Sequence, residues 1–173
     1  YLYGHLTSLF GDVPFILEPL NIDELYGPRD SREKVIDFIL NELEEAAGLL
    51  PPEIRIGPKL GRLSKGAALG LKARIALYNK RYNIAEKAAK DVMDLGVYSL
   101  YSNGDPSSSY NELFTHAGKL AGGRNRETII ARTNLEDVSM HNLSRLIQVP
   151  NEISRFSPTK SLVDSYLCSD GLP

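Results

Sequence analysis

The sequence lacks the residues on which several classes of protein depend. Its 173 residues include one cysteine, Cys168, so an internal disulfide is excluded. The three histidines, His5, His116 and His141, are far apart and show no metal-ligand spacing, so we expect no metal site. No apolar run approaches the roughly 18 residues of a membrane-spanning helix. Tryptophan is absent, so an aromatic binding surface has to come from nine tyrosines and five phenylalanines.

The charge pattern excludes further classes of protein. Lys and Arg number 20 against 22 Asp and Glu with both signs interspersed, which disfavours binding to nucleic acid or to an anionic membrane. Gly118-Lys119 lacks the other residues of a phosphate-binding loop, and no G-x-S-x-G motif is present. The carboxylates of the predicted helices lie on polar faces, where they are ordinarily solvated. We therefore expect neither an enzyme nor a cofactor.

Residues 64–96 contain the clearest regular pattern. Apolar residues recur at helical spacing over 65–79 and again over 82–95, which predicts two antiparallel helices joined by a short turn. Aromatic and small residues face each other across that turn, as is typical of a tetratricopeptide-type hairpin: Tyr78, Tyr82, Ala85 and Ala89. The alternative is an ordinary antiparallel pair in a helical bundle.

Two glycines, Gly66 and Gly70, interrupt the first of these helices. Each costs about 1 kcal/mol of helix stability relative to alanine. We expect a close approach of a neighbouring helix backbone to offset this cost, with Gly70 facing that backbone. Lys65, Lys72 and Asn79 recur every seven residues, so they are expected to form the strip of this helix that faces water.

These patterns predict a mainly α protein of tetratricopeptide-like helical hairpins with an irregular, loop-rich C-terminal portion. A helix over 31–50, beginning at a capping box of Asp30 and Glu33, should pack against the hairpin. Because regular periodicity becomes sparse beyond the hairpin, we expect a helical scaffold at 1–115 and an irregular portion at 116–173. No second copy of the hairpin recurs at a fixed period.

Shorter patterns lie at both ends of the chain. Residues 1–10 predict the end of a helix, 127–131 a short strand, and 159–167 a short final helix. The side chains expected to face inward on the first and last of these are Leu2, Leu6, Leu9 and Phe10, and Leu162, Val163 and Tyr166.

Aromatic residues fall into two groups. Tyr78 and Tyr82 lie on apolar helical faces, so we expect them to pack. The second group lies in or beside loops rich in Ser, Asn and Gly: Tyr98, Tyr101, Tyr110 and Phe156. Aromatic residues in such loops either form a platform for sugar rings or lie tucked beneath the loops, and the sequence leaves both possibilities open.

Nine short stretches, in order along the chain, resemble the SusD/RagB family, the cell-surface nutrient-binding lipoproteins of Bacteroidetes. They are Phe10-Gly11-Asp12-Val13-Pro14; Arg29-Asp30-Ser31-Arg32-Glu33; Gly61-Arg62 with Ser64-Lys65-Gly66-Ala67-Ala68; Lys72-Ala73-Arg74 with Tyr78 and Tyr82; Tyr98-Ser99-Leu100; Tyr110-x-x-Leu113-Phe114; Asn125-x-Glu127-x-Ile129-Ile130; Pro158-Thr159 with Leu162-Val163-Asp164; and Asp170-Gly171-x-Pro173. All of these motifs are architectural.

The resemblance implies a tetratricopeptide-like scaffold with an irregular ligand-binding region. It implies a lipid anchor in the outer membrane at the cell surface, and a partner TonB-dependent transporter of the SusC type that imports captured oligosaccharide. It also implies that the chain is an internal segment, because the lipidated leader, the first helices and the C-terminal portion of family members have no counterpart in the sequence.

The resemblance supplies a ligand class, an oligosaccharide, but no residue inherits a binding role, because glycan contacts in the family follow no fixed motif. The candidates in the loop-rich region are Tyr101, Tyr110, His141, Asn142, Arg145 and Phe156. Two alternatives stay open. One is a tetratricopeptide-type adaptor that binds peptide in a helical groove. The other is a glycosidase, which needs two carboxylates roughly 5 to 9 Å apart across a cleft.

Overall fold

The computed structural model describes residues 1–22, 26–53, 62–119, 125–131 and 157–166. It divides into two units, 1–132 and 133–173, each described by itself. The first unit contains α1 (Leu2–Phe10), α2 (Arg32–Leu49), α3 (Lys65–Tyr78), α4 (Tyr82–Asp94), α5 (Pro106–Leu113) and α6 (His116–Lys119), and the second contains α8 (Lys160–Asp164). The part of the chain that the structure describes contains helices and no strands, so the predicted mainly α class is confirmed. The expected boundary between 115 and 116 stays a prediction.

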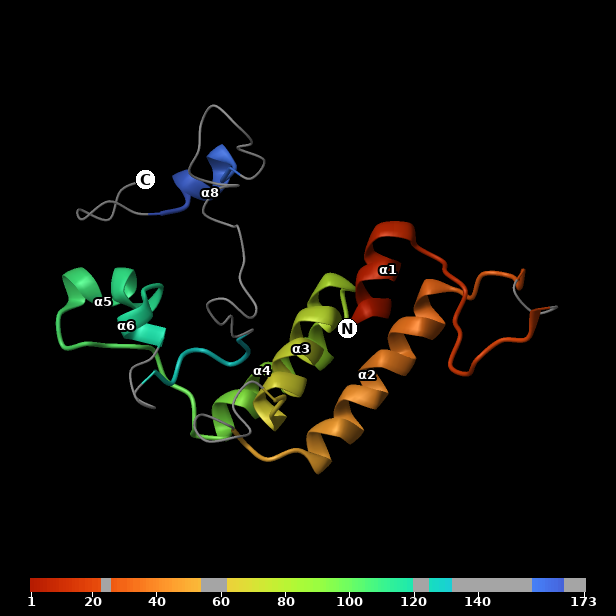
Figure 1. Cartoon of the computed structure of the whole chain (residues 1–173), viewed down its shortest axis with the longest axis horizontal. Helices are drawn as coiled ribbons and strands as arrows, with labels where there is room; N and C mark the ends of the chain where they lie inside the picture. Colours follow the sequence, from red (N-terminus) through yellow and green to blue (C-terminus); the bar gives the residue numbers. More distant parts are fainter. Residues whose placement is uncertain (23–25, 54–61, 120–124, 132–156, 167–173) are drawn as a thin grey trace. The chain divides into compact units, whose positions relative to one another are not determined.

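The predicted helical hairpin is confirmed as α3 and α4, joined by Asn79, Lys80 and Arg81. Lys80 adopts a φ of 58°, in the left-handed region, and the Arg81 amide donates to the carbonyl of Ala76, which closes the turn. α2 packs on the other side of α3, as expected, so the three helices lie side by side with α3 in the middle (Figure 1).

Small and branched side chains hold these three helices together. Val35 and Ile36 of α2 are almost fully buried and pack in one cluster with Ile75 and Ala76 of α3. The whole set of buried apolar residues in this cluster is Val13, Val35, Ile36, Ile39, Leu40, Ile75, Ala76 and Ala85. Each fully buried Val or Ile contributes roughly 1.5 to 3 kcal/mol, so this cluster is the main source of stability for the scaffold.

The start of α2 is held by the two family motifs nearest the N-terminus. Val13 and Asp30 form an isolated antiparallel bridge through both of their backbone hydrogen bonds. The Asp12 carboxylate accepts from the Arg32 amide at 2.8 Å, and Ser31, not the expected box of Asp30 and Glu33, caps the helix. The predicted capping box is wrong because the Asp30 carboxylate instead accepts from the Phe15 amide and pairs with the Lys34 ammonium.

The inward face of α1 differs from the expectation. Leu2, Leu6, Leu9 and Phe10 are exposed. The face with Gly4 and Thr7 packs instead: a Cβ on Gly4 would lie 3.2 Å from Ile75 Cδ1, and Thr7 is fully buried. The Thr7 hydroxyl donates to the carbonyls of Tyr3 and Gly4, so its burial leaves no polar group unsatisfied.

The polar strip of α3 was also placed wrongly. Lys72 pairs with Glu44 of α2 at 2.6 Å and its side chain is largely buried, while Asn79 Oδ1 accepts from Arg32 Nε at 3.0 Å. Lys72 and Asn79 therefore face α2 rather than water. Tyr78 and Tyr82, expected to pack, are 71% and 62% exposed.

The close contact in α3 occurs at Gly66 and involves a side chain, whereas Gly70 makes none. A Cβ on Gly66 would lie 2.5 Å from Tyr98 Cζ, and closer still to its Oη and Cε2. A Cβ on Gly70 would meet only Ile129 Cγ2 at 3.9 Å, an ordinary contact, so the expected backbone packing at Gly70 is wrong. Helix periodicity could not distinguish the two glycines, because the contacting residue lies 32 positions further along the chain.

The C-terminal expectations were partly met. Residues 127–131 form no strand, because the Asn125 side chain accepts from the amides of Glu127 and Thr128 and turns the chain there. The short final helix is present as α8, capped by Thr159, but Leu162, Val163 and Tyr166 are exposed.

Candidate functional site

The structure describes two of the six candidate ligand-binding residues, Tyr101 and Tyr110. The other four, His141, Asn142, Arg145 and Phe156, lie outside the described residues. Tyr98, also considered as a loop aromatic, is half-buried against Gly66, and its hydroxyl forms a 3.2 Å hydrogen bond with Ser64 Oγ. Tyr98 is therefore a packing residue of the scaffold.

Tyr101 is held from both ends by carboxylates. Its amide donates to Glu127 Oε2 at 2.8 Å, and its hydroxyl donates to Glu112 Oε1 at 2.8 Å. The ring is half-buried, so it offers less apolar face to a ligand than a free loop tyrosine. The hydrogen bond from the Tyr101 hydroxyl fixes the side chain of Glu112. Because Glu112 lies on α5, this bond joins the segment before α5 to the helix.

Tyr110 forms part of an aromatic pair on α5. It lies four residues before Phe114, so both rings emerge from the same side of the helix. The rings meet edge to face with centroids 5.2 Å apart and an interplanar angle of 76°, and the two residues are 58% and 63% exposed. Phe114 was not among the candidate residues, although its spacing of four from Tyr110 was the signal that could have found it.

The sequence before α5 explains why this helix forms. Asp105 is its N-cap and accepts from the Ser107 amide at 2.9 Å, and Pro106 occupies the first turn, where a missing N–H costs nothing. The hydrogen bonds that the Ser107 side chain and amide and the Ser108 hydroxyl donate to Asp105 lower the pKa of its carboxyl below the ordinary value. The cap is therefore charged at neutral pH, at the end of the helix where a negative charge is stabilising.

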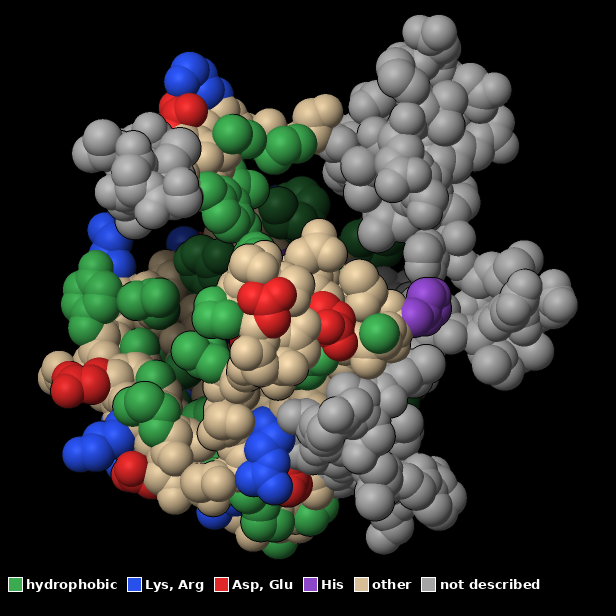
Figure 2. All heavy atoms as spheres, turned by 90° about the vertical axis from the view of Figure 1, so that its left-hand side faces the viewer, with side chains coloured by type: hydrophobic (Ala, Val, Ile, Leu, Met, Phe, Trp, Pro, Cys, Tyr) green, Lys and Arg blue, Asp and Glu red, His purple; other side chains and the backbone are tan. Residues whose placement is uncertain are grey.

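Polar side chains surround α5. The side-chain NH2 group of Asn103 donates to Glu112 Oε2 and to Ser108 Oγ, and its Oδ1 accepts from the Ser109 hydroxyl at 2.7 Å. Figure 2 shows the molecule from the side on which α5 lies in Figure 1: hydrophobic side chains lie on this surface among backbone and other uncharged groups, with acidic and basic side chains between them. Exposed apolar rings beside amides and hydroxyls are the chemistry that a sugar ring requires.

The turn after α5 is fixed by a close backbone approach. A Cβ on Gly118 would lie 2.7 Å from the carbonyl carbon of Glu112 and 2.9 Å from Leu113 Cα, so only glycine fits there. The buried Asn125 amide donates to the Gly118 carbonyl at 3.2 Å. The family motif that begins at Asn125 therefore bonds to α6 through Asn125 and to Tyr101 through Glu127.

Other kinds of site are absent from the part of the chain that the structure describes. No group of three or more His, Cys, Asp or Glu side chains is placed to hold a metal ion. None of the described helices is long and apolar enough to cross a membrane.

No protein-family model matches the chain. Two solved structures from Bacteroides fragilis are similar to it. A SusD-like protein shares 31% sequence identity at a TM-score of 0.64, and a SusD-like carbohydrate-binding protein shares 28% at a TM-score of 0.65. They cover 78% and 77% of this chain. The chain belongs to the SusD-like family.

A curated relative agrees with this membership: a SusD-like protein of Formosa agariphila is 27% identical in an alignment of 118 residues that covers 63% of this chain. The resemblance inferred from the short motifs is thereby confirmed. The SusD-like chain spans 21% of the length of that relative and 25% of each of the two solved structures.

Proposed function

We propose that the protein containing this SusD-like chain binds an oligosaccharide at the bacterial cell surface without cleaving it, and delivers it to a TonB-dependent transporter of the SusC type. In this proposal a lipid anchor holds the protein to the outer membrane. The single observation that carries the ligand class is the exposed ring pair of Tyr110 and Phe114, in a chain that is 28% identical to a SusD-like carbohydrate-binding protein.

The proposed contact follows from the chemistry of a sugar ring. A pyranose has an apolar C–H face edged with hydroxyls, so stacking on Tyr110 or Phe114 removes apolar area from water. Asn103, just before α5, and Ser109, on α5 itself, are hydrogen-bonded to each other and can exchange hydrogen bonds with those hydroxyls. Tyr101 acts in this proposal as a positioning residue for Glu112. The candidates His141, Asn142, Arg145 and Phe156 remain part of the proposal as further contacts.

Calorimetric titration with a panel of neutral oligosaccharides tests this platform. We expect Tyr110→Ala and Phe114→Ala each to weaken binding about tenfold, the equivalent of roughly 1.4 kcal/mol, since each removes one stacking face. Tyr82→Ala is the matched control, because Tyr82 is exposed to a similar degree but lies on α4. Equal weakening by all three variants, or none by any, would contradict the assignment of the site to α5.

The remaining candidates and the delivery step have their own tests. Phe156→Ala and Arg145→Ala should also weaken binding of the oligosaccharide if these residues complete the site. Delivery predicts that the protein co-purifies from outer membranes with a transporter of the SusC type. Loss of sugar uptake on deletion of the protein, restored by the wild-type sequence and not by Tyr110→Ala, would connect the platform to transport.

A further inference from the structure

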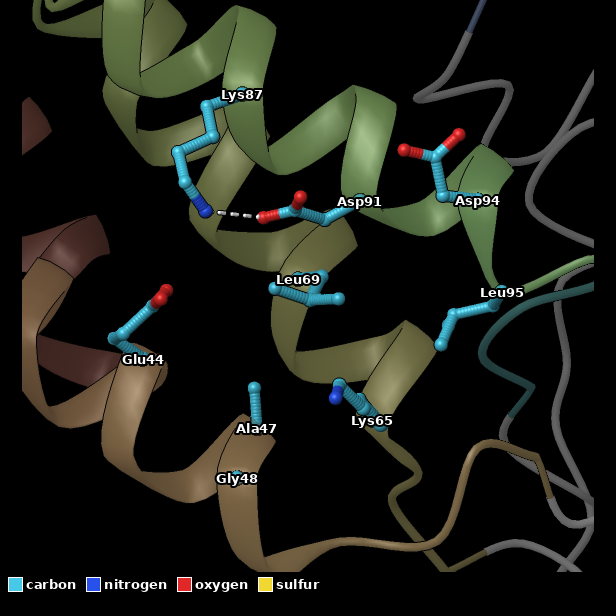
Figure 3. A pocket seen from close by; sticks show the side chains of 9 residues that line it. All are labelled: Glu44, Ala47, Gly48, Lys65, Leu69, Lys87, Asp91, Asp94 and Leu95. Atoms are coloured by element: carbon cyan, nitrogen blue, oxygen red, sulfur yellow. Dashed lines mark hydrogen bonds and ion pairs between the residues drawn. The ribbon is translucent and has the colours of Figure 1, made fainter.

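The cavity between α2 and α4 has a volume of about 400 Å³ but offers little to a ligand (Figure 3). Ala47 and Leu69, which line it, are buried among the packed helices, and Lys87 donates to Asp91 of the same helix at 2.7 Å. Much of the cavity lining is therefore already engaged within the protein. A chemically reactive pair of residues lies elsewhere, in the loop before α5.

Asn103 and Gly104 form the one Asn-Gly pair in the sequence. In such a pair the backbone nitrogen of glycine can attack the side-chain Cγ of asparagine, because glycine has no Cβ to shield that nitrogen or to restrict the backbone. The N–Cγ bond forms, the Cγ–Nδ2 bond breaks, and Nδ2 leaves as ammonia with the proton of the glycine amide. Water then opens the resulting succinimide to aspartate or isoaspartate. Both residues are exposed, so water reaches them.

Four hydrogen bonds hold the Asn103 carboxamide in place. Its Nδ2 donates to Glu112 Oε2 and to Ser108 Oγ, so both hydrogens of the NH2 group are engaged. Its Oδ1 accepts from the Ser109 hydroxyl at 2.7 Å and from the Asp105 amide at 2.9 Å. Attack on Cγ turns the planar carboxamide into a tetrahedral centre and expels Nδ2. The bonds to Nδ2 must therefore be released before the reaction can proceed, which raises its barrier.

The charges around Asn103 oppose the same reaction. The attack builds negative charge first on the nitrogen of Gly104 and then on Asn103 Oδ1, and nearby carboxylates disfavour that charge. Glu112 bonds Asn103 directly, and hydrogen bonds from serine lower the pKa of Asp105, so Asp105 stays ionised at neutral pH. The Gly104 amide is also engaged, because it donates to Ser102 Oγ at 3.1 Å.

Glu112 is fixed in turn by Tyr101, whose hydroxyl donates to the other carboxylate oxygen, Oε1, at 2.8 Å. We propose that Asn103 is a deamidation site that Glu112 holds in check, and that its conversion is a one-way covalent change just before α5. Loss of Nδ2 removes both donors, and the new carboxylate lies opposite the carboxylate of Glu112. Like charges then replace a hydrogen bond, so the original contact cannot form again.

The conversion would reach the proposed glycan platform through α5. Ser108, Ser109 and Glu112 all lie on this helix, which also carries the aromatic ring pair. Releasing Asn103 from two of these three residues weakens the attachment of the loop to α5. The effect on glycan binding rests on the proposed function, whereas the deamidation itself does not.

The test incubates purified protein at mildly alkaline pH and follows the mass of the peptide containing Asn103 by mass spectrometry after digestion. Glu112→Gln should deamidate about tenfold faster than wild type, because a hydrogen bond to a charged group is lost from the unreacted state. Tyr101→Phe releases Glu112 but keeps its charge, so its acceleration should be smaller. Glu45→Gln is the matched control, since it removes an exposed carboxylate of α2 and should leave the rate unchanged.

Two further measurements separate the local contact from general loosening of the protein. Circular dichroism of each variant establishes that it is folded. In urea concentrated enough to unfold the protein, wild type and all three variants should react at one common, faster rate. Asn83 provides a control within the same sample, because it is exposed but is followed by the bulky Ile84, and its peptide should keep its mass.

The proposal is overturned if folded wild type deamidates as fast as the unfolded protein, or if folded Glu112→Gln and wild type react at the same rate. Asn103→Asp reproduces one product, and hydrogen exchange in α5 should be faster in it than in wild type. Its affinity for a neutral oligosaccharide should be up to about tenfold lower. If wild type binds no sugar, the proposed function fails and the deamidation rates still decide this proposal. Equal affinities would refute only the connection between the two.

Discussion

Two glycines in one helix should respond to alanine in opposite directions. Gly70→Ala adds a methyl group where the nearest side-chain atom is 3.9 Å away, so the gain in helix propensity is kept, and the free energy of unfolding should rise by about 0.5 to 1 kcal/mol. Gly66→Ala makes the same chemical change where the Tyr98 ring already fills the space. The ring must move away from α3, and its contacts are lost.

The magnitude at Gly66 follows from those contacts. Tyr98 is half-buried, so displacing its ring costs about 1 kcal/mol of apolar burial, and the lost hydrogen bond between its hydroxyl and Ser64 Oγ costs about 1 kcal/mol more. Against this stands a helix-propensity gain of at most about 1 kcal/mol, since Gly66 lies in the first turn of α3. The net expectation for Gly66→Ala is a loss of about 1 kcal/mol.

Urea denaturation followed by far-ultraviolet circular dichroism measures both changes, and a double-mutant cycle isolates the cause. In a Tyr98→Ala background no ring remains to be displaced, so Gly66→Ala should become neutral or stabilising. If Gly66→Ala stabilised the wild-type protein as much as Gly70→Ala does, or if the Tyr98→Ala background left its effect unchanged, the packing of Tyr98 on α3 would be refuted.

Three other changes follow from single sites. Gly118→Ala should destabilise the protein by about 1 to 3 kcal/mol in urea denaturation, because its Cβ meets the backbone of Glu112; a neutral result would contradict that approach. Lys80→Gly should stabilise the hairpin by up to about 1 kcal/mol in the same assay, since it relieves a left-handed φ, and a destabilised variant would argue against this turn. The hydrogen bonds from Ser107 and Ser108 lower the pKa of Asp105, so the stability from its capping of α5 is fully present above the unfolded pKa of 3.8 and is lost as pH falls through the folded pKa. Hydrogen exchange in α5, corrected for its intrinsic pH dependence, should therefore accelerate on acidification. In Asp105→Ala this exchange should already be fast at neutral pH.

The sequence predicted the parts of the fold that rest on local periodicity. α2, α3 and α4 and the short turn at Asn79 were recoverable because each has an apolar pattern, a cap or a stop within its own residues. The sequence did not predict which face of each helix points towards its neighbours. Lys72 and Asn79 look like a solvated strip until Glu44 and Arg32 are seen opposite them, and those partners lie 28 and 47 residues away.

The candidate site was predictable in kind and less so in detail. Ser-rich and Asn-rich loops with tyrosine left two possibilities open, an exposed aromatic platform or rings tucked beneath the loops, and Tyr110 is exposed. Phe114 was not among the candidate residues, and no local pattern predicts its exposure, because that depends on how α5 meets the rest of the first unit. Tyr98 and Tyr101 occupy similar loop sequence, yet their hydroxyls bond to Ser64 and Glu112, contacts that no local pattern encodes.

The central claim is binding of an oligosaccharide without turnover, and one measurement addresses both halves of it. The purified protein is titrated calorimetrically with an oligosaccharide from the panel, and the sugar is then recovered and its chain length determined. The account predicts a saturable heat of binding and recovery of the oligosaccharide at its original length. The affinity should be about tenfold lower for Tyr110→Ala. Shortened oligosaccharide, with cleavage abolished by changing one carboxylate, would contradict it, as would the absence of binding to every sugar in the panel.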